Sequence, residues 1–548
     1  WRLERCCKKN FKLDKEIKLF SSENRGLLLN KIKSQSFDIT IIGGGITGSG
    51  ICLDAVSRGL KVCLIEMNDF ASGTSSKSTK LIHGGLRYLE QFNFSLVRET
   101  GKERAVLHYI APHIVKPEKM LIPISKGGKL NRFSTSLALS VYDFLANVKK
   151  KDRKKLINKD SIHEKEPLLS SGNIKGGAIY SEYRTDDSRL TIEILKKSYK
   201  MGAYPINYVK FISSKHNKNN LSELKCRDQI SGKEFQIKSE VIVNAAGAWV
   251  DNVVEGKKNK LVLSKGVHIV IPKDKLPLNQ SIYFDAVDDR MVFAIPRRET
   301  VYIGTTDTLY NRPIDDIRVN KEEVEYLLDS VNNFFDPVLK IDDVISSWVG
   351  LRPLIKEDKK NITEISRKDE IFISDDGIIS IAGGKLTGYR KMAERVLKQI
   401  SKKINITISA SKTDKLKIST SSFEICFNKV STHFDKKISR RLFNRYGEDI
   451  LMIHEIYMDL LKKYKSKFLL FSELIYCIEN EMCHNLTDFF TQRNSMAYFE
   501  IQKIKKEVKL FKSLYIKLEG KSSQIFLKEE KELDSYLKKI STFIWLGH

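Results

Sequence analysis

The sequence lacks the cysteine spacing of a disulfide-stapled or metal-binding domain. Its eight cysteines are scattered at positions 6, 7, 52, 63, 226, 426, 477 and 483, and no two form a Cys-x-x-Cys pair. This scatter predicts no disulfide framework, no metal site and a reducing compartment. The sequence also has no run of about 18 to 20 uncharged apolar residues, so it predicts no membrane-spanning helix.

Acidic residues are scarce relative to basic ones. The chain has 95 Lys and Arg against 68 Asp and Glu, a formal net charge of +27, and such an excess favours anionic partners. It contains no zinc-finger spacing, basic-region helix or ribonucleoprotein motif, so we expect a phosphorylated substrate or an acidic lipid surface and no nucleic acid. Residues 1–36 form a basic extension, which we interpret as the remnant of a mitochondrial targeting segment although its acids are unusual there.

Residues 37–66 have the pattern of a dinucleotide-binding unit. A strand leads into Gly43-Gly-Gly-Ile-Thr-Gly48 and a helix, and a second apolar run ends at Glu66. Gly43 allows the tight turn, Gly45 lets backbone approach a pyrophosphate, and Gly48 lets the helix pack on the sheet. The helix N-terminus favours the anion, and Glu66 would accept hydrogen bonds from a ribose. The alternative is a glycine-rich turn without a ligand.

Three further segments suit contacts with the same cofactor. A hydroxyl-rich loop over 72–80 continues into Leu81-Ile-His-Gly-Gly85, a buried strand over 241–249 ends in small residues, and a strand feeds a glycine turn and a helix over 383–390. Besides the glycines and Glu66, the candidate cofactor-binding residues are therefore Thr74, Ser75, Ser76, Lys80, Leu81, His83, Gly84, Gly85, Ala246, Gly247, Trp249, Gly384, Lys385, Leu386 and Thr387.

The rest of the chain predicts an α/β protein of several parts. We expect helices over 95–110 and 320–335, a basic, loop-rich stretch over 116–171, antiparallel strands over 261–271, 291–295 and 301–304, and a hairpin around 375–377. From 403 onward the chain is helix-rich and nearly free of proline and glycine. We predict a Rossmann-like cofactor-binding domain (37–115, 172–258 and 345–402), an antiparallel-sheet substrate or cap domain (116–171 and 259–344) and a helical C-terminal domain (403–548).

Taken together, these motifs resemble the FAD-dependent glycerol-3-phosphate dehydrogenases. The signatures are Ile42-Gly-Gly-Gly-x-x-Gly-Ser-Gly50, Lys80-Leu-Ile-His-Gly-Gly-Leu-Arg-Tyr-Leu89, Lys265-Gly-Val-His268, Ile303-Gly-Thr-Thr-Asp307, Gly350-Leu-Arg-Pro-Leu354 and Gly383-Gly-Lys-x-x-Gly-Tyr-Arg390, in family order. The similarity covers about residues 37–400. Cys52 stands where the family usually has alanine, and a thiol of similar size should not prevent FAD binding. No Asp-x-Asp-x-Asp-Gly loop occurs, so we expect no calcium switch.

The resemblance implies a reaction and partners. The cofactor would be FAD, the substrate sn-glycerol 3-phosphate, the product dihydroxyacetone phosphate, and the electron acceptor ubiquinone or another membrane quinone. It also implies peripheral, monotopic attachment to the mitochondrial inner membrane and is compatible with a homodimer.

The resemblance also suggests which residues carry the chemistry. Oxidising a secondary alcohol requires hydride transfer to the flavin, removal of the hydroxyl proton and stabilisation of the charge that develops on oxygen. His268 is the candidate base, held neutral by nearby arginines, although Arg352 or a water could share that task. With Arg352 and Lys385 it forms the catalytic set. The residues matching family substrate-site positions are Arg87, Tyr88, Arg352, Arg367 and Lys385.

Three other functions remain open from the sequence. An amine or amino-acid oxidase could use the same flavin scaffold, but it would bind a carboxylate with one arginine. A glycerol-3-phosphate oxidase would pass the electrons to oxygen. A basic nucleic-acid-binding or scaffold protein could retain a degenerate nucleotide fold without activity. Read one at a time, the arginines are ordinary surface charges and His268 is a structural histidine.

Overall fold

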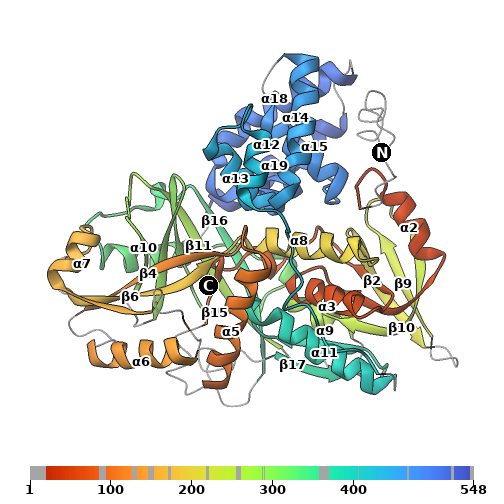
Figure 1. Ribbon diagram of the computed structural model, residues 1–548, viewed down its shortest axis with the longest axis horizontal. Coiled ribbons are helices and arrows are strands. Elements are labelled where there is room, and N and C mark those ends of the chain that lie inside the picture. Colours follow the sequence, from red (N-terminus) through yellow and green to blue (C-terminus); the bar gives the residue numbers. More distant parts are fainter. Residues whose placement is uncertain are drawn as a thin grey trace.

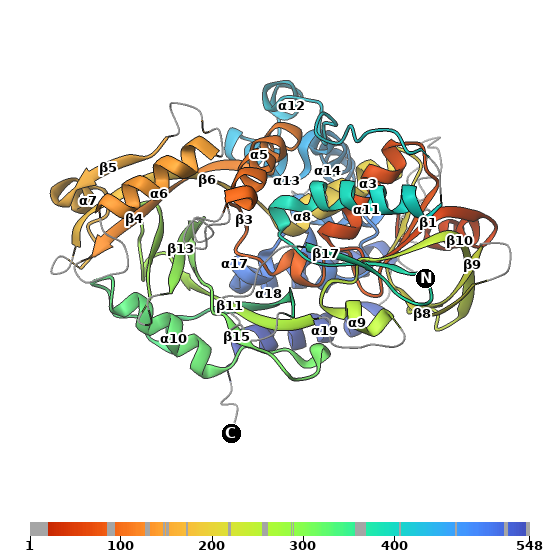
Figure 2. The same cartoon turned by 90° about the horizontal axis from the view of Figure 1, so that it is seen from below.

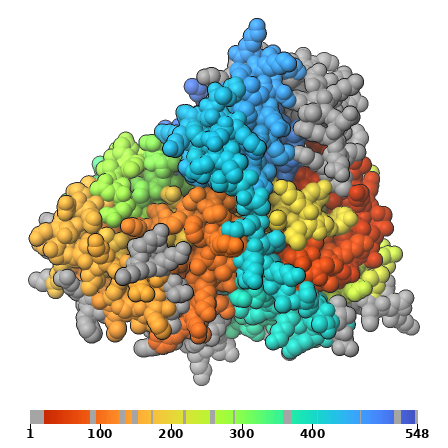
Figure 3. Space-filling model, viewed as in Figure 1, coloured from red at the N-terminus to blue at the C-terminus, as the bar shows by residue number. Residues whose placement is uncertain are grey.

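The computed structural model describes residues 20–84, 94–125, 132–145, 148, 153–170, 174–216, 221–254, 261–286, 288, 290–356, 369–404, 407–465, 468–519 and 524–543. Two sheets lie beside each other, and a group of helices from the C-terminal part of the chain stands over them (Figure 1). In the space-filling view this helical group sits above the junction of the two sheet-containing halves (Figure 3).

The first sheet has a parallel centre. Its order is β17 (Asp369–Ile373), β18 (Ile379–Gly383), β10 (Glu234–Asn244), β1 (Ser36–Ile42), β2 (Val62–Ile65) and β7 (Tyr204–Ile206), with β9 (Ser222–Asp228) beside β10 and β8 (Val209–His216) beside β9. β18, β10, β1, β2 and β7 run parallel, whereas β17, β9 and β8 pair antiparallel. All four residues of β2 are buried, as expected for a parallel strand covered on both faces.

Helices cover this first sheet. α3 (Ile46–Ser57) packs between α8 (Asp187–Lys200) and α11 (Tyr389–Lys403), and α2 (Arg25–Lys33) lies against β7 and β10. Four short elements follow glycine-containing or hydroxyl-rich segments. They are α9 (Val250–Val253) and the turns Thr74–Ser76, Gly247–Trp249 and Leu386–Gly388. Seen from below, α3, α8 and α11 run beside one another (Figure 2).

The second sheet is mostly antiparallel. Its order is β15 (Thr308–Leu309), β11 (Leu261–Pro272), β14 (Thr300–Gly304), β13 (Met291–Arg297), β12 (Ser281–Asp285), β4 (Lys116–Ser125), β6 (Ile174–Arg184) and β3 (Leu81–Ile82). β16 (Ser346–Ile355) pairs with β11 and β5 (Lys155–Asn158) with β6. α6 (Arg132–Leu145) and α7 (Lys159–Lys165) contact β6, and α10 (Lys321–Asn332) contacts β11. α5 (Phe94–Ile110) contacts α6 and the turn Leu386–Gly388.

The C-terminal helices share a hydrophobic core with the second sheet, from which Tyr302 and Trp348 contribute. These helices are α12 (Phe423–Val430), α13 (Lys436–Tyr446), α14 (Ile450–Tyr464), α15 (Leu469–Asn480), α16 (Leu486–Asp488), a π-helical turn over Phe489–Arg493, α17 (Met496–Phe499), α18 (Ile501–Glu519) and α19 (Gln524–Ser541). Among the described residues, none of the helices combines the length and apolar character needed to cross a membrane.

The predicted fold class is confirmed: a Rossmann-like part, an antiparallel sheet and a helical C-terminal domain are all present. The exact domain limits stay a prediction. β3, β6 and β16 belong to the second sheet, although the prediction grouped their residues with the cofactor-binding domain.

The loop-rich reading of residues 116–171 was wrong. This stretch holds β4, α6, β5 and α7. Its lysines and prolines argue against a strand, yet residues 120–124 of β4 are buried. β6 pairs with β4 along its length and β12 pairs on its other side. Long-range pairing therefore overrides the local composition.

Candidate active site

A cavity of about 1150 Å³ opens at the junction of the two sheets. Its walls include the carboxyl ends of β1, β2, β10 and β18, where ligands of parallel sheets usually bind. β11 and β16 contribute a second wall through residues such as His268 and Arg352. The predicted residues that line it are Gly43, Gly45, Glu66, Thr74, Ser75, Leu81, His83, Ala246, Gly247, Trp249, His268, Arg352, Gly384, Lys385, Leu386 and Thr387.

The first glycine turn is shaped for close backbone approach. Gly43 has a φ of +112°, and a Cβ there would lie 2.5 Å from the carbonyl oxygen of Ala245. A Cβ on Gly48 would overlap the carbonyl oxygen of Gly43. Gly45 faces the cavity, and the Ile46 N–H donates to Ser75 Oγ at 2.8 Å. These residues fit a pyrophosphate at the start of α3.

Glu66 holds this turn from the end of β2. Its Oε2 accepts from the Gly44 N–H at 2.7 Å, and its Oε1 accepts from the Asn68 N–H at 2.9 Å. Burial raises the pKa of this carboxyl, and the backbone donors oppose that rise. Because each carboxylate oxygen has a second acceptor position, Glu66 can still receive ribose hydroxyls.

The hydroxyl-rich loop separates into lining and supporting residues. Thr74 and Ser75 line the cavity, and Thr74 donates to the Leu351 carbonyl at 2.7 Å. Lys80 lines no part of the cavity: its buried ammonium pairs with Asp187 at 2.7 Å and donates to the Ser76 carbonyl at 3.0 Å. Lys80 therefore ties this loop to α8.

Three other predicted cofactor residues also lie behind the lining. Ser76 is buried, and its hydroxyl donates to the Gly73 carbonyl at 3.3 Å. The Gly84 N–H donates to the hydroxyl of Tyr142 at 3.2 Å. Gly48 packs against the glycine turn. These residues shape the wall from behind.

His268 lies on β11, in the wall that the second sheet contributes. Its ring is buried, stacks on Trp348 with centroids 4.8 Å apart, and shares a 2.9 Å hydrogen bond between Nε2 and the Thr79 hydroxyl. Its partner across the strands is Gly304, where a Cβ would lie 2.6 Å from the ring Cγ. Burial, and then Arg352 and Lys80, hold the pKa of His268 well below its usual range. The arginine effect expected from the sequence is present, but burial is the larger cause.

Arg352 approaches the same wall from β16. Its Nη2 donates to Thr305 Oγ1 at 2.9 Å, and its Nη1 donates to the Thr306 carbonyl at 3.2 Å. Asp307 lies 3.4 Å from Nη1. The guanidinium passes over Gly266, where a Cβ would lie 2.6 Å from its Cζ. With about one fifth of its side chain exposed, Arg352 is a fixed cation at the cavity wall.

Some predicted site residues lie outside the described ranges, and some residues that line the cavity were not predicted. Gly85, Arg87, Tyr88 and Arg367 lie outside the described residues. Reasoning from the sequence missed Thr79, Thr305 and Asp307, which line the cavity beside His268 and Arg352. Their signal was available, because Thr79 belongs to the hydroxyl-rich loop and the other two to the segment Ile303–Asp307.

The sequence matches known protein families and relatives along most of its length. Residues 38–390 match the family model "FAD dependent oxidoreductase", and residues 380–512 match "C-terminal domain of alpha-glycerophosphate oxidase". The aerobic glycerol-3-phosphate dehydrogenase of Staphylococcus saprophyticus is 44% identical over 509 residues, covering 88% of this chain and 91% of the relative. That of Staphylococcus aureus is 44% identical over 508 residues, with the same shares of the two chains covered.

Comparison with solved structures also finds a glycerol-3-phosphate dehydrogenase. The glycerol-3-phosphate dehydrogenase from Bacillus halodurans, complexed with FAD, superposes with a TM-score of 0.81 at 36% identity, covering 96% of this chain and 100% of the other. Glycine oxidase from Geobacillus kaustophilus, with a TM-score of 0.52, 16% identity, and 71% of this chain and 99% of the other covered, shares only the fold.

These relatives correct one prediction. They are bacterial, so the predicted mitochondrial location was wrong. Net charge and a basic N-terminal stretch could not distinguish a targeting segment from an ordinary basic surface. The prediction of FAD as the cofactor is confirmed. On the strength of the motifs, the cavity and these matches, the chain belongs to the family of FAD-dependent glycerol-3-phosphate dehydrogenases.

Proposed function

We propose that this chain oxidises sn-glycerol 3-phosphate to dihydroxyacetone phosphate and passes the electrons to a membrane quinone. The observation that supports this most is a single cavity lined both by a neutral histidine and a fixed arginine, His268 and Arg352, and by the glycine turn suited to FAD. When bound, FAD supplies the hydride acceptor. The names of the Staphylococcus and Bacillus relatives support the substrate.

The protein supplies proton transfer and anion binding. Because His268 is neutral, its Nε2, now paired with the Thr79 hydroxyl, can accept the proton of the substrate hydroxyl. Arg352 and Lys385 both line the cavity and would bind the phosphate and the developing alkoxide. Arg87, Tyr88 and Arg367 would complete the phosphate contacts.

The acceptor and the surroundings of the enzyme are further proposals. A quinone acceptor requires access to a lipid phase, and the net charge of +27 would favour a peripheral acidic membrane surface. Oxygen is the second candidate acceptor, because the C-terminal region matches a domain described from alpha-glycerophosphate oxidase. A homodimer is compatible with either acceptor.

Anaerobic reduction of the bound flavin tests the proposal. Glycerol 3-phosphate should bleach the flavin absorbance within the mixing time or shortly after, whereas sarcosine should leave it oxidised. Reoxidation by a soluble quinone analogue should then outpace reoxidation by air, with little peroxide released. Bleaching by sarcosine alone would reject the substrate, and fast peroxide release would reject the quinone.

A further inference from the structure

The C-terminal helical domain contacts the reverse side of the cavity wall. Between β2 and the turn at Thr74, residues 66–73 line the cavity through Glu66, Met67, Asn68, Ser72 and Gly73. Asp69 lies within this segment but takes no part in the lining, and only 3% of it is exposed. Its carboxylate receives both terminal nitrogens of Arg493, at 2.5 and 2.9 Å. A buried bidentate ion pair thus joins the wall to the C-terminal domain.

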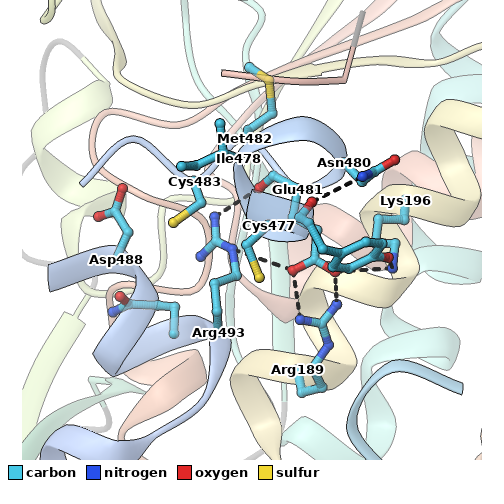
Figure 4. Close-up of polar contacts among 12 residues, drawn as sticks. Arg189, Lys196, Cys477, Ile478, Asn480, Glu481, Met482, Cys483, Asp488 and Arg493 are labelled. Atoms are coloured by element: carbon cyan, nitrogen blue, oxygen red, sulfur yellow. Dashed lines mark hydrogen bonds and ion pairs between the residues drawn. The ribbon is translucent and has the colours of Figure 1, made fainter. Parts of the chain in front are cut away.

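Arg493 is itself fixed by its own domain. It closes the π-helical turn before α17 and donates to the Glu481 carbonyl at 2.9 Å. Two cations of α8 donate hydrogen bonds to the Glu481 carboxylate: Arg189 Nη1 at 2.8 Å and Lys196 Nζ at 3.1 Å (Figure 4). The arginine therefore has little freedom to follow the wall if the wall moves.

A second wall segment is held by the same helices. Val209 and Lys210 line the cavity, and the preceding Tyr208 donates its hydroxyl to Asp488 at 2.7 Å. The Tyr208 N–H donates to the Asn68 carbonyl at 3.0 Å, so the two wall segments are also tied to each other. Asn207 bridges them from behind, donating to Asp69 at 2.8 Å and to the Met482 carbonyl at 2.9 Å.

Where a loop in the wall of a site becomes ordered only on ligand binding, the cost of that ordering weakens the observed affinity. Here the two wall segments are held in advance by one buried ion pair and two hydrogen bonds to the C-terminal domain. We propose that Arg493 is a positioning residue for the nucleotide half of FAD, holding residues 66–73 in their binding conformation from the C-terminal domain. This rests on the cofactor placement inferred above, with the glycine turn and Glu66 at the nucleotide end.

The test is FAD affinity measured on the apoprotein. Arg493→Met removes the guanidinium while keeping most of the side-chain volume. We expect the FAD dissociation constant, from quenching of flavin fluorescence, to rise at least tenfold, which is about 1.4 kcal/mol. Arg445→Met is a stringent control, because Arg445 is also buried in this domain, pairs with Glu473 at 2.7 Å and donates to the carbonyl of Asn494 at 3.1 Å, next to Arg493, but it touches no wall segment. Its dissociation constant should stay within threefold of the parent.

A double-mutant cycle separates positioning from general loss of stability. Asp69→Asn should weaken FAD binding, and adding Arg493→Met to it should produce little further loss, because both changes remove the same contact. At saturating FAD, the KM for glycerol 3-phosphate should not change. If Arg493→Met fails to fold, Arg493→Lys replaces it and should show a smaller rise in the dissociation constant.

Two outcomes would overturn the proposal: an unchanged FAD dissociation constant in the Arg493 variant, or an equal rise in the Arg445 control. Because FAD binding is measured without substrate, the result stands apart from the proposed reaction. A chain that bound FAD as described and oxidised a different alcohol would still support the positioning by Arg493.

Discussion

At the scale of single residues, the site combines groups whose charges are fixed by their surroundings. Arg352 is held by Thr305 and Thr306, and His268 is kept neutral mainly by burial. Neither feature follows from the residue type alone. The roles proposed for them, a base and an anion site, require that β11 and β16 pair side by side.

Replacing Arg352 or Lys385 by alanine should lower kcat/KM for glycerol 3-phosphate by roughly thirtyfold to several thousandfold, with flavin still bound. Loss of one partner of a desolvated charge pair costs on the order of 2 to 5 kcal/mol of transition-state stabilisation. Steady-state kinetics with glycerol as a second substrate provides the control, since glycerol never uses the phosphate contacts. Equal proportional losses for both substrates would assign these residues to the flavin or the fold instead.

At the scale of secondary structure, glycines decide where functional side chains can lie. Gly304 on β14 faces His268 on β11, and Gly266 on β11 faces Arg352 on β16. Each glycine removes a Cβ that would occupy the space of an imidazole or a guanidinium. The strand pairing therefore forms the site as much as the charged residues do.

Gly304→Ala should displace the imidazole of His268, because the new methyl group would lie inside its contact distance. We expect the rate of flavin reduction by substrate to fall at least tenfold while FAD binding is retained; stopped-flow absorbance measures this. Gly26→Ala is the control, since its Cβ would meet nothing within 4 Å on α2. An unchanged reduction rate in Gly304→Ala would mean that His268 is not in the reacting position.

The sequence predicted the elements with strong local signals better than the others. The strand, glycine turn and helix over 37–57 appear as β1 and α3, and the expected helix over 95–110 appears as α5. β4 was missed because Pro117 and Pro123 argue against a central strand. Its pairing partners, β6 and β12, come from far along the chain and leave no local signal. Lys80 was assigned to the cofactor because nothing local reveals Asp187, its partner on α8.

At the scale of the whole molecule, buried charges join the helical domain to the cofactor-binding part. Burial, and then the neighbouring Asp69, raise the pKa of Asp488 to about 8. In the unfolded chain this carboxyl titrates near about 4. Because the folded pKa is the higher one, the contribution of Asp488 to stability is complete below about pH 4 and is lost as the pH rises through about 8.

Asp488→Asn should therefore melt at a higher temperature than the parent under alkaline conditions, with the difference growing by a few degrees between pH 6 and pH 9. Differential scanning fluorimetry across that range measures it. Asp449→Asn should behave oppositely: Lys196 offsets burial and holds the pKa of Asp449 below its usual range, so that variant should lose stability at neutral and alkaline pH. If the difference in melting temperature between Asp488→Asn and the parent stayed constant across this pH range, Asp488 would not titrate within it.

The sequence by itself determined the cofactor class and the order of the parts. Those features depend on local backbone demands, such as a positive φ at Gly43 and close helix packing at Gly48, which only particular residues satisfy. The tertiary structure decided which side chains meet. The pairing of Asp69 with Arg493 joins residues 424 positions apart, and the meeting of His268 with Thr79 joins residues 189 apart. Contacts of that range depend on how whole sheets and domains pack, and no local pattern encodes them.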